Sequence, residues 1–177
     1  MNDQDHNART PHRAEFTYDI AASPEQVWQA IATARGISTW MVPTSLDPRV
    51  GGEVSFDFGD FSLTGTVTAY EPQTRFAYEE PWPIAERSEE ISPEMADWFE
   101  SRNVPLEQVY DDLAQATPIA TEFLVEAQSG GSCVVRIITS AYGAGSDWEN
   151  EFFEEMVETT RPIWDALAAH FTLVEIR

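Results

Sequence analysis

The chain has 177 residues, of which 42% are hydrophobic, and this length suits one folded domain with a sizeable core. Its 31 acidic and 10 basic residues give a formal net charge of −21, which argues against nucleic acid and anionic membranes as partners because both repel such a field. All ten basic residues are arginines, which excludes Schiff-base chemistry and phosphate loops that depend on a lysine.

The sequence predicts a cytoplasmic protein. Cys133 is the only cysteine, so no disulfide can form within the chain and nothing specifies an oxidising compartment. No apolar run approaches the about 20 residues that a membrane-spanning helix needs. The polar start of the chain also lacks the apolar core of a signal peptide.

The first part of the chain carries a tail, a strand pattern and a helix start. Residues 1–14 are polar and predict a flexible tail. From Phe16 to Ile20, apolar and polar residues alternate as in a half-buried strand. The S-P-E-Q motif that begins at Ser23 has the cap, proline and glutamine of a helix start, and this helix should end near Gly36.

Three strands of an antiparallel meander are expected next. Apolar and polar residues alternate over 53–58, a glycine–aspartate pair makes a tight turn, and a longer strand covers 61–70. Phe76 and Tyr78 then mark a third strand. Short connections of this kind join neighbouring antiparallel strands.

Residues 81–118 interrupt this pattern with five of the eleven prolines and many acidic residues. The S-P-E-M motif at Ser92 and the helical spacing of apolar residues from Leu106 to Leu113 predict two short helices. We interpret the segment as an insertion that lies over one end of the sheet.

Two more strands and a long helix close the chain. Strand patterns cover 119–127 and 133–140, and an S-D-W-E capping box begins at Ser146. Apolar residues then recur every three or four positions to about His170, which predicts a long amphipathic helix. The whole order predicts an α+β fold in which a curved antiparallel sheet wraps around a long C-terminal helix.

Candidate catalytic groups are scarce. His6 and His12 fall in the predicted tail and His170 lies near the end of the last helix, so no histidine is expected beside a nucleophile. Acidic residues at the start of that helix, including Glu149, suit a solvated face at the positive end of the helix dipole. Cys133 suits a small buried hydrophobic residue. We therefore predict no catalytic residue, and no metal-ligand or cofactor motif is present in the sequence.

Arg136 and the aromatic residues are the candidates for a binding site. Arg136 lies in a predicted strand whose two faces are both fairly apolar, so it is either exposed or reaches into a cavity to anchor an acidic group of a ligand. The aromatic side chains either form a plain core or line a partly open pocket against the last helix. The candidate walls of this pocket are Trp40, Phe56, Phe58, Phe76, Tyr78, Phe123, Val135, Met156 and Trp164.

Four segments resemble the SRPBCC superfamily, also called START-like helix-grip proteins. These are F-T-Y-D-I-A-A-S-P-E-Q-V-W-Q-A-I, S-T-W-M-V-P, R-V-G-G-E-V-S-F and G-T-V-T-A-Y-E-P-Q-T-R-F-A-Y. They are most similar to the branch named after the activator of the ninety-kilodalton heat-shock chaperone's ATPase. The likeness covers residues 15–80 well and 119–172 moderately, whereas 81–118 departs from the short connection usual in that branch. It implies one helix-grip domain over 15–177.

The resemblance implies a hydrophobic cavity for lipids, polyketides or hormones, and in some members cyclase or hydrolase chemistry. The branch itself implies a co-chaperone role. We therefore prefer binding of a small hydrophobic ligand between the sheet and the C-terminal helix, which favours a protein without enzyme activity. A cyclase- or hydrolase-type enzyme and a co-chaperone-like protein-interaction module are the alternatives. The partner expected first is a small apolar molecule, while a chaperone, another protein or a homodimer stays open.

Overall fold

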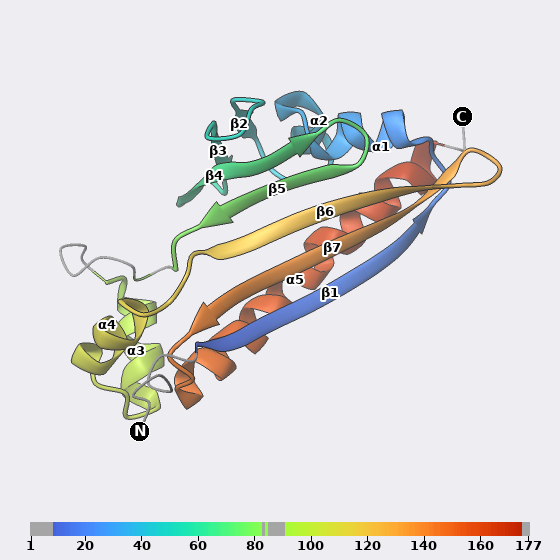
Figure 1. Cartoon of the computed structure of the whole chain (residues 1–177). Coiled ribbons are helices and arrows are strands. Elements are labelled where there is room, and N and C mark those ends of the chain that lie inside the picture. The colour runs from blue at the N-terminus through green and yellow to red at the C-terminus, as the bar shows by residue number, and fades with distance from the viewer. Residues whose placement is uncertain (1–8, 83, 85–90, 175–177) are drawn as a thin grey trace, which may run out of the picture.

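The computed structural model describes residues 9–82, 84 and 91–174, which form one seven-stranded sheet and five helices (Figure 1). The strands are β1 (Thr10–Ile20), β2 (Thr44–Leu46), β3 (Glu53–Asp57), β4 (Ser62–Glu71), β5 (Arg75–Glu80), β6 (Ile119–Gln128) and β7 (Ser132–Gly143). The helices are α1 (Pro24–Ile31), α2 (Ala34–Trp40), α3 (Pro93–Ser101), α4 (Leu106–Leu113) and α5 (Asp147–Val174).

The sheet is antiparallel throughout and has the strand order β1-β7-β6-β5-β4-β3-β2. Strands β2 to β7 form a meander. The first strand, β1, pairs along its whole length with the last strand, β7. Gly59 and the pair Gly130–Gly131 have positive φ, which lets two of the hairpin turns close tightly. A shift in register between Val67 and Ala69 marks an irregularity of the kind that bends a strand.

Helix α5 lies along one face of the sheet, behind β6, β7 and β1 in Figure 1. Alternate residues of the strands point to this inner face and are buried, as Val135 and Ile137 are in β7. Trp164 and Leu167 of α5 belong to the same core. The predicted α+β arrangement of a curved sheet around a long C-terminal helix is confirmed.

Helices α1 and α2 cover the end of the core that the last turns of α5 reach (Figure 1). The predicted capping box is present in full, because the Ser23 side chain accepts from the backbone N–H of Gln26 and the Gln26 side chain accepts from that of Ser23. The Thr33 side chain caps α2 by accepting from the N–H of Gly36. A Cβ at Gly36 would lie 1.7 Å from the carbonyl oxygen of Gln29, so only glycine lets the two helices approach this closely.

The segment between β5 and β6 contains α3 and α4, as predicted, and both helices lie beyond the opposite end of the sheet (Figure 1). The Ser92 side chain caps α3. A second hydrophobic cluster forms where Phe99 of α3 and Val109 of α4 meet Trp148 and Phe153 of α5. This cluster anchors the insertion to the first turns of α5.

The predicted flexible tail over 1–14 is wrong for its last five residues, which already belong to β1. His12 is buried rather than solvated, with its ring 5.3 Å from that of Phe153. The inward positions Thr10 and His12 are polar, so the sequence shows no strand alternation there. His6 lies outside the described residues.

Candidate ligand site

The inner face of the sheet carries a row of aromatic side chains that α5 and α2 cover. Phe76 of β5 pairs with Phe123 of β6, and their rings stack with centroids 6.1 Å apart. Trp164 of α5 packs edge-on against Phe123, and Trp40 of α2 lies beside Trp164. These side chains surround an internal space of only about 10 Å³. Its lining residues are Ile31, Ile37, Trp40, Met41, Phe56, Phe76, Tyr78, Phe123 and Trp164.

Trp164 brings an unsatisfied polar group to this apolar space. Its side chain is buried, and its indole nitrogen Nε1 has no hydrogen-bond partner among the described residues. The neighbouring Trp40 differs, because its Nε1 donates to the carbonyl oxygen of Ala30 at 2.8 Å. A buried donor without an acceptor is unfavourable, so an acceptor on a bound molecule would stabilise Trp164 where it lies.

Six of the predicted wall residues line this space, namely Trp40, Phe56, Phe76, Tyr78, Phe123 and Trp164. Val135 is buried in the surrounding core, and Phe58 packs at the edge of that core, where its ring stacks on Phe61. Met156 belongs to the second cluster, beneath the insertion. The sequence therefore predicted most of the aromatic residues around this space, whereas Val135, Phe58 and Met156 lie outside its lining.

The interpretation of Arg136 as a ligand anchor is wrong, and its alternative, an exposed side chain, is correct. Strand β7 alternates strictly, so Val135 and Ile137 point inward while Arg136 points to the outer face. There its Nε donates to Glu15 at 2.7 Å. This guanidinium and that of Arg13 lower the pKa of Glu15 to about 2.

The next row of the inner face is polar. Tyr78 of β5 pairs with Thr121 of β6, which pairs with Thr139 of β7, and all three side chains are buried. Burial, with a contribution from the charge of Glu80, raises the pKa of Tyr78 far above its ordinary value. The hydroxyl of Tyr78 is therefore a neutral donor and acceptor at the edge of the aromatic space.

Glu80 is a candidate residue that the sequence analysis did not single out. It shares the inner face with Tyr78 and Phe76, two and four residues before it, whereas Glu79 points outward. Burial raises the pKa of Glu80 from 4.5 to about 7. Its carboxyl group forms no hydrogen bond or ion pair with any described residue. The alternation of β5 was the signal in the sequence that could have placed Glu80 on the inner face.

Gly65 of β4 makes room for the Glu80 side chain. A Cβ at this position would lie 2.5 Å from the carbonyl oxygen of Glu79 and 2.9 Å from Cγ of Glu80. Any larger residue would force the end of β5 to shift. The position of the half-buried Glu80 side chain therefore depends on a glycine in the neighbouring strand.

A buried His12–Glu149 pair lies at the start of α5. The expectation of a solvated Glu149 is wrong, since this side chain has no exposed surface. Its carboxylate accepts from the backbone N–H groups of Ala144 and Ser146, at 3.1 and 2.9 Å. Half of the predicted capping box is thus present, because the Ser146 hydroxyl instead donates to Asp112. His12 Nε2 lies 3.7 Å from the carboxylate, and both groups are closed off from a ligand.

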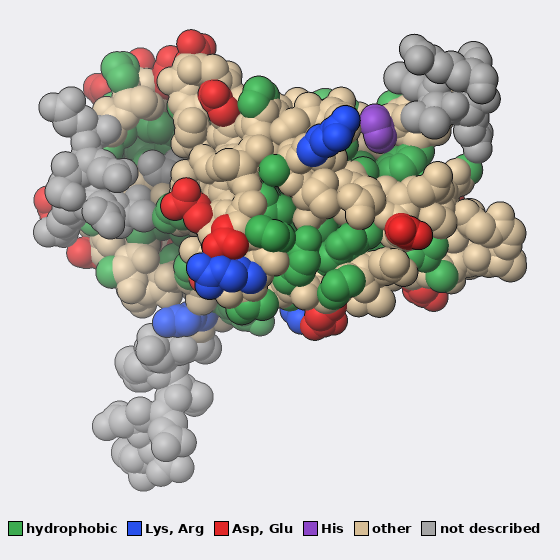
Figure 2. Space-filling model, turned by 90° about the horizontal axis from the view of Figure 1, so that it is seen from above, with side chains coloured by type: hydrophobic (Ala, Val, Ile, Leu, Met, Phe, Trp, Pro, Cys, Tyr) green, Lys and Arg blue, Asp and Glu red, His purple; other side chains and the backbone are tan. Residues whose placement is uncertain are grey.

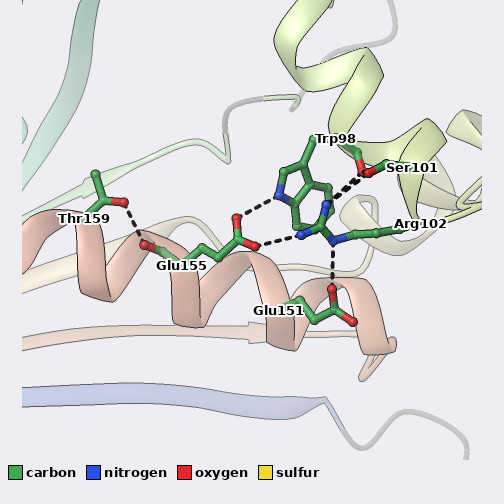
Figure 3. A network of polar contacts seen from close by, with 6 residues as sticks. All are labelled: Trp98, Ser101, Arg102, Glu151, Glu155 and Thr159. Atoms are coloured by element: carbon green, nitrogen blue, oxygen red, sulfur yellow. Dashed lines mark hydrogen bonds and ion pairs between the residues drawn. The ribbon is translucent and has the colours of Figure 1, made fainter.

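Charged side chains also fasten the insertion to α5 (Figure 3). The guanidinium of Arg102, which directly follows α3, binds Glu151 and Glu155 of α5, each at 2.8 Å. The same group lies 3.8 Å above the centre of the Trp98 ring, whose Nε1 donates to Glu155. This network bridges two elements that are about fifty residues apart in the sequence.

The described residues offer neither a cluster of metal ligands nor a helix suited to span a membrane. In the part of the chain that the structure describes, no three His, Cys, Asp or Glu side chains are grouped to hold a metal ion. None of the described helices combines the length and apolar character that crossing a bilayer requires. Cys133 is buried, as predicted, and its thiol lies 3.1 Å from the carbonyl oxygen of Ala22.

The sequence model of the family described as activator of Hsp90 ATPase homolog 1-like protein matches residues 21–172. The chain belongs to this family. The match covers the core of the fold from α1 to the last turns of α5, so the predicted resemblance is confirmed. A search of curated proteins finds no match.

Solved structures share the fold of this AHSA1 family member at low sequence identity. A protein from Mesorhizobium loti has a TM-score of 0.60 at 15% identity, covering 89% of this chain and 95% of its own. The Aha1 dimer from Colwellia psychrerythraea scores 0.53 at 19% identity, covering 89% and 96%. A norcoclaurine synthase point mutant from Thalictrum flavum, in complex with a transition-state analogue, scores 0.54 at 13%, covering 95% and 98%. These likenesses show the helix-grip fold.

Proposed function

We propose that the protein binds a small, largely apolar molecule between the inner face of the sheet and α5. The observation that carries this proposal is the unpaired indole N–H of Trp164 beside a space with aromatic walls. The helix-grip fold commonly binds hydrophobic ligands, which supports the same interpretation. The ligand is therefore expected to be apolar over most of its surface and to carry one hydrogen-bond acceptor.

The site must enlarge before a ligand enters, because its free volume is about 10 Å³. An empty cavity of roughly 150 Å³, which suits a benzene-sized molecule, would cost about 4 kcal/mol in the ligand-free protein. Closure without ligand is therefore the favoured state. The walls most able to move are the short helices α1 and α2, with eight and seven residues, whereas the other walls belong to the paired sheet and the 28-residue α5.

Two probes of similar shape test the role of Trp164. Acetophenone has a carbonyl acceptor, and isopropylbenzene has a methyl-bearing carbon in its place. Relative to the partition of the two probes between water and an apolar solvent, acetophenone is expected to be preferred over isopropylbenzene about fivefold or more, because a hydrogen bond to a buried donor contributes about 1 kcal/mol or more. Binding is measured from the chemical shifts of the protein during titration.

The variant Trp164→Phe keeps an aromatic ring and removes the N–H. It is expected to abolish the preference for acetophenone while isopropylbenzene still binds. Trp98→Phe on the exposed side of α3 is the matched control and should leave the preference intact. The proposal fails if neither probe shifts the signals of the lining residues, or if the preference survives in Trp164→Phe.

A second candidate function is proton transfer on a bound ligand, which the state of Glu80 favours. A carboxyl group with a pKa of about 7 exchanges a proton readily near neutral pH. Its charge acts on Tyr78, which lines the aromatic space, so Tyr78 links Glu80 to the place where the proposed ligand would lie, while Glu80 itself lines a separate open pocket beside β4. This corresponds to the enzyme alternative, with Glu80 as its acid or base.

The same acetophenone probe tests this chemistry. A general base near the carbonyl accelerates exchange of the methyl protons for deuterium, which proton signals follow over time. The wild-type protein should accelerate exchange and Glu80→Gln should not, while Glu79→Gln keeps the activity. Equal rates for all three proteins would remove the enzyme alternative and leave ligand binding in place. The co-chaperone-like role stays a prediction.

A further inference from the structure

A second, open groove lies on the other side of α1 and α2, between these helices and the last turns of α5. It has a volume of about 500 Å³. Its lining residues are Gln26, Gln29, Ala30, Thr33, Arg35, Gly36, Thr39, His170 and Phe171. None of these nine residues is acidic, although the chain contains 31 acidic residues. Figure 2 shows a basic and a histidine side chain next to each other on the face that carries α1 and α2.

Arg35 is the charged group of this groove, and no carboxylate among the described residues pairs with it. Its side chain forms no ion pair with any described residue, whereas Arg49, Arg136 and Arg161 each bind an acidic side chain. In a chain with three acidic residues for every arginine, an unpaired guanidinium is unusual. Such a group offers several N–H donors in a planar fork that matches a carboxylate or phosphate.

Most of the other polar side chains in the groove already form hydrogen bonds within the protein, so only a few remain for a ligand. The hydroxyls of Thr33 and Thr39 donate to the backbone carbonyls of Gln29 and Gly36. The side-chain oxygen of Gln26 accepts from the N–H of Ser23. The side chains of Arg35, Gln29 and His170 have no such partner among the described residues. They are therefore the groups left to hold a polar ligand.

An apolar surface adjoins these donors. Phe171 is half-buried, and its ring contacts that of His170 edge-on at 5.3 Å. Ala30 contributes a buried methyl group. Backbone atoms form the floor of the groove, because α2 approaches α1 closely at Gly36. A ligand with an anionic group and a flat apolar body fits this combination of a cationic end and an aromatic wall.

We propose that the groove between α1, α2 and the end of α5 binds small organic anions, with Arg35 holding the carboxylate or phosphate and Phe171 contacting the apolar body. The net charge of −21 repels anions at long range, so a surface whose described lining contains no carboxylate is where the local field favours them most. This inference does not depend on the aromatic site under Trp164, because the two sites use different sides of α1 and α2.

Titration calorimetry of the full chain with three probes tests the groove. Benzoate and phenyl phosphate carry the two anionic groups, and benzyl alcohol is the uncharged control. Both anions are expected to bind at least tenfold more tightly than benzyl alcohol, since hydrogen bonds to a charged group contribute about 1.5 kcal/mol or more. Tighter binding of one anion identifies the group that the site prefers, and either order supports the proposal.

Variants separate this groove from the rest of the surface. Arg35→Gln should weaken both anions about tenfold, while Arg49→Gln, which removes an arginine already paired with Asp47, should change neither Kd by more than twofold. Trp164→Phe should leave anion binding intact. The proposal is overturned if the anions bind no better than benzyl alcohol, or if Arg35→Gln and Arg49→Gln have equal effects.

Discussion

Replacing Glu80 with glutamine should stabilise the protein, and more so at high pH. Burial raises the pKa of this carboxyl group from 4.5 to about 7, so the folded protein binds more protons than the unfolded chain between these values. Stability is therefore lost as the pH rises through this window. Each pKa unit corresponds to about 1.4 kcal/mol, so the free energy that ionisation removes above pH 7 is about 3 kcal/mol.

Glutamine keeps the size of the side chain and removes the ionisation. The gain in the free energy of unfolding for Glu80→Gln should approach about 3 kcal/mol at pH 8 and fall to about 1 kcal/mol at pH 5. Urea denaturation at both pH values and constant salt measures it. Glu79→Gln is the matched control, because it removes the same charge from the outer face of the same strand. A gain that is equal at both pH values, or equal in the two variants, would refute the reasoning.

Two further substitutions test the packing around the site. Gly65→Ala should lower the free energy of unfolding by about 2 kcal/mol, because its Cβ would clash with the backbone of β5, and the melting temperature should fall accordingly. Thr66→Ala, at the exposed neighbouring position, should change the melting temperature little. Arg102→Met should lower the free energy of unfolding by only about 1 kcal/mol, since the ion pairs are partly exposed. It should nevertheless speed limited proteolysis of the segment between β5 and β6. Arg161→Met, which removes a pair within α5, should not change that cleavage, and equal cleavage in both variants would contradict the bridging role.

Much of the fold could be predicted because local rules and tertiary packing agree. The capping box at Ser23 forms with both of its hydrogen bonds, and the period-2 alternation of β7 holds from Cys133 to Ala141. The predictions fail where a residue is buried by elements that are distant in the sequence. His12 is covered by Trp82 and Phe153, which are far away in the sequence, so nothing local indicates that this end of β1 is buried.

The candidate site was predicted in outline but not in volume. Periodicity identifies which aromatic residues face inward, and it does not report how closely two elements approach. The close contact at Gly36 sets the distance between α1 and α2, and Trp40 then reaches the space beside Trp164. Whether aromatic side chains fill a cavity or leave one open depends on such tenths of an ångström. The sequence therefore predicted the walls and could not predict the free volume of about 10 Å³.

Polar groups on the inner face of the sheet differ in how far their partners compensate for burial. Glu149 is fully buried, and its carboxyl oxygens accept hydrogen bonds from two backbone N–H groups, so it stabilises the start of α5. Glu80 is half-buried and has no such partner among the described residues. Its ionised form is therefore destabilised, as its raised pKa indicates. A glutamine of equal size would avoid this loss, so we expect the carboxyl group of Glu80 to matter for a bound molecule rather than for the stability of the fold.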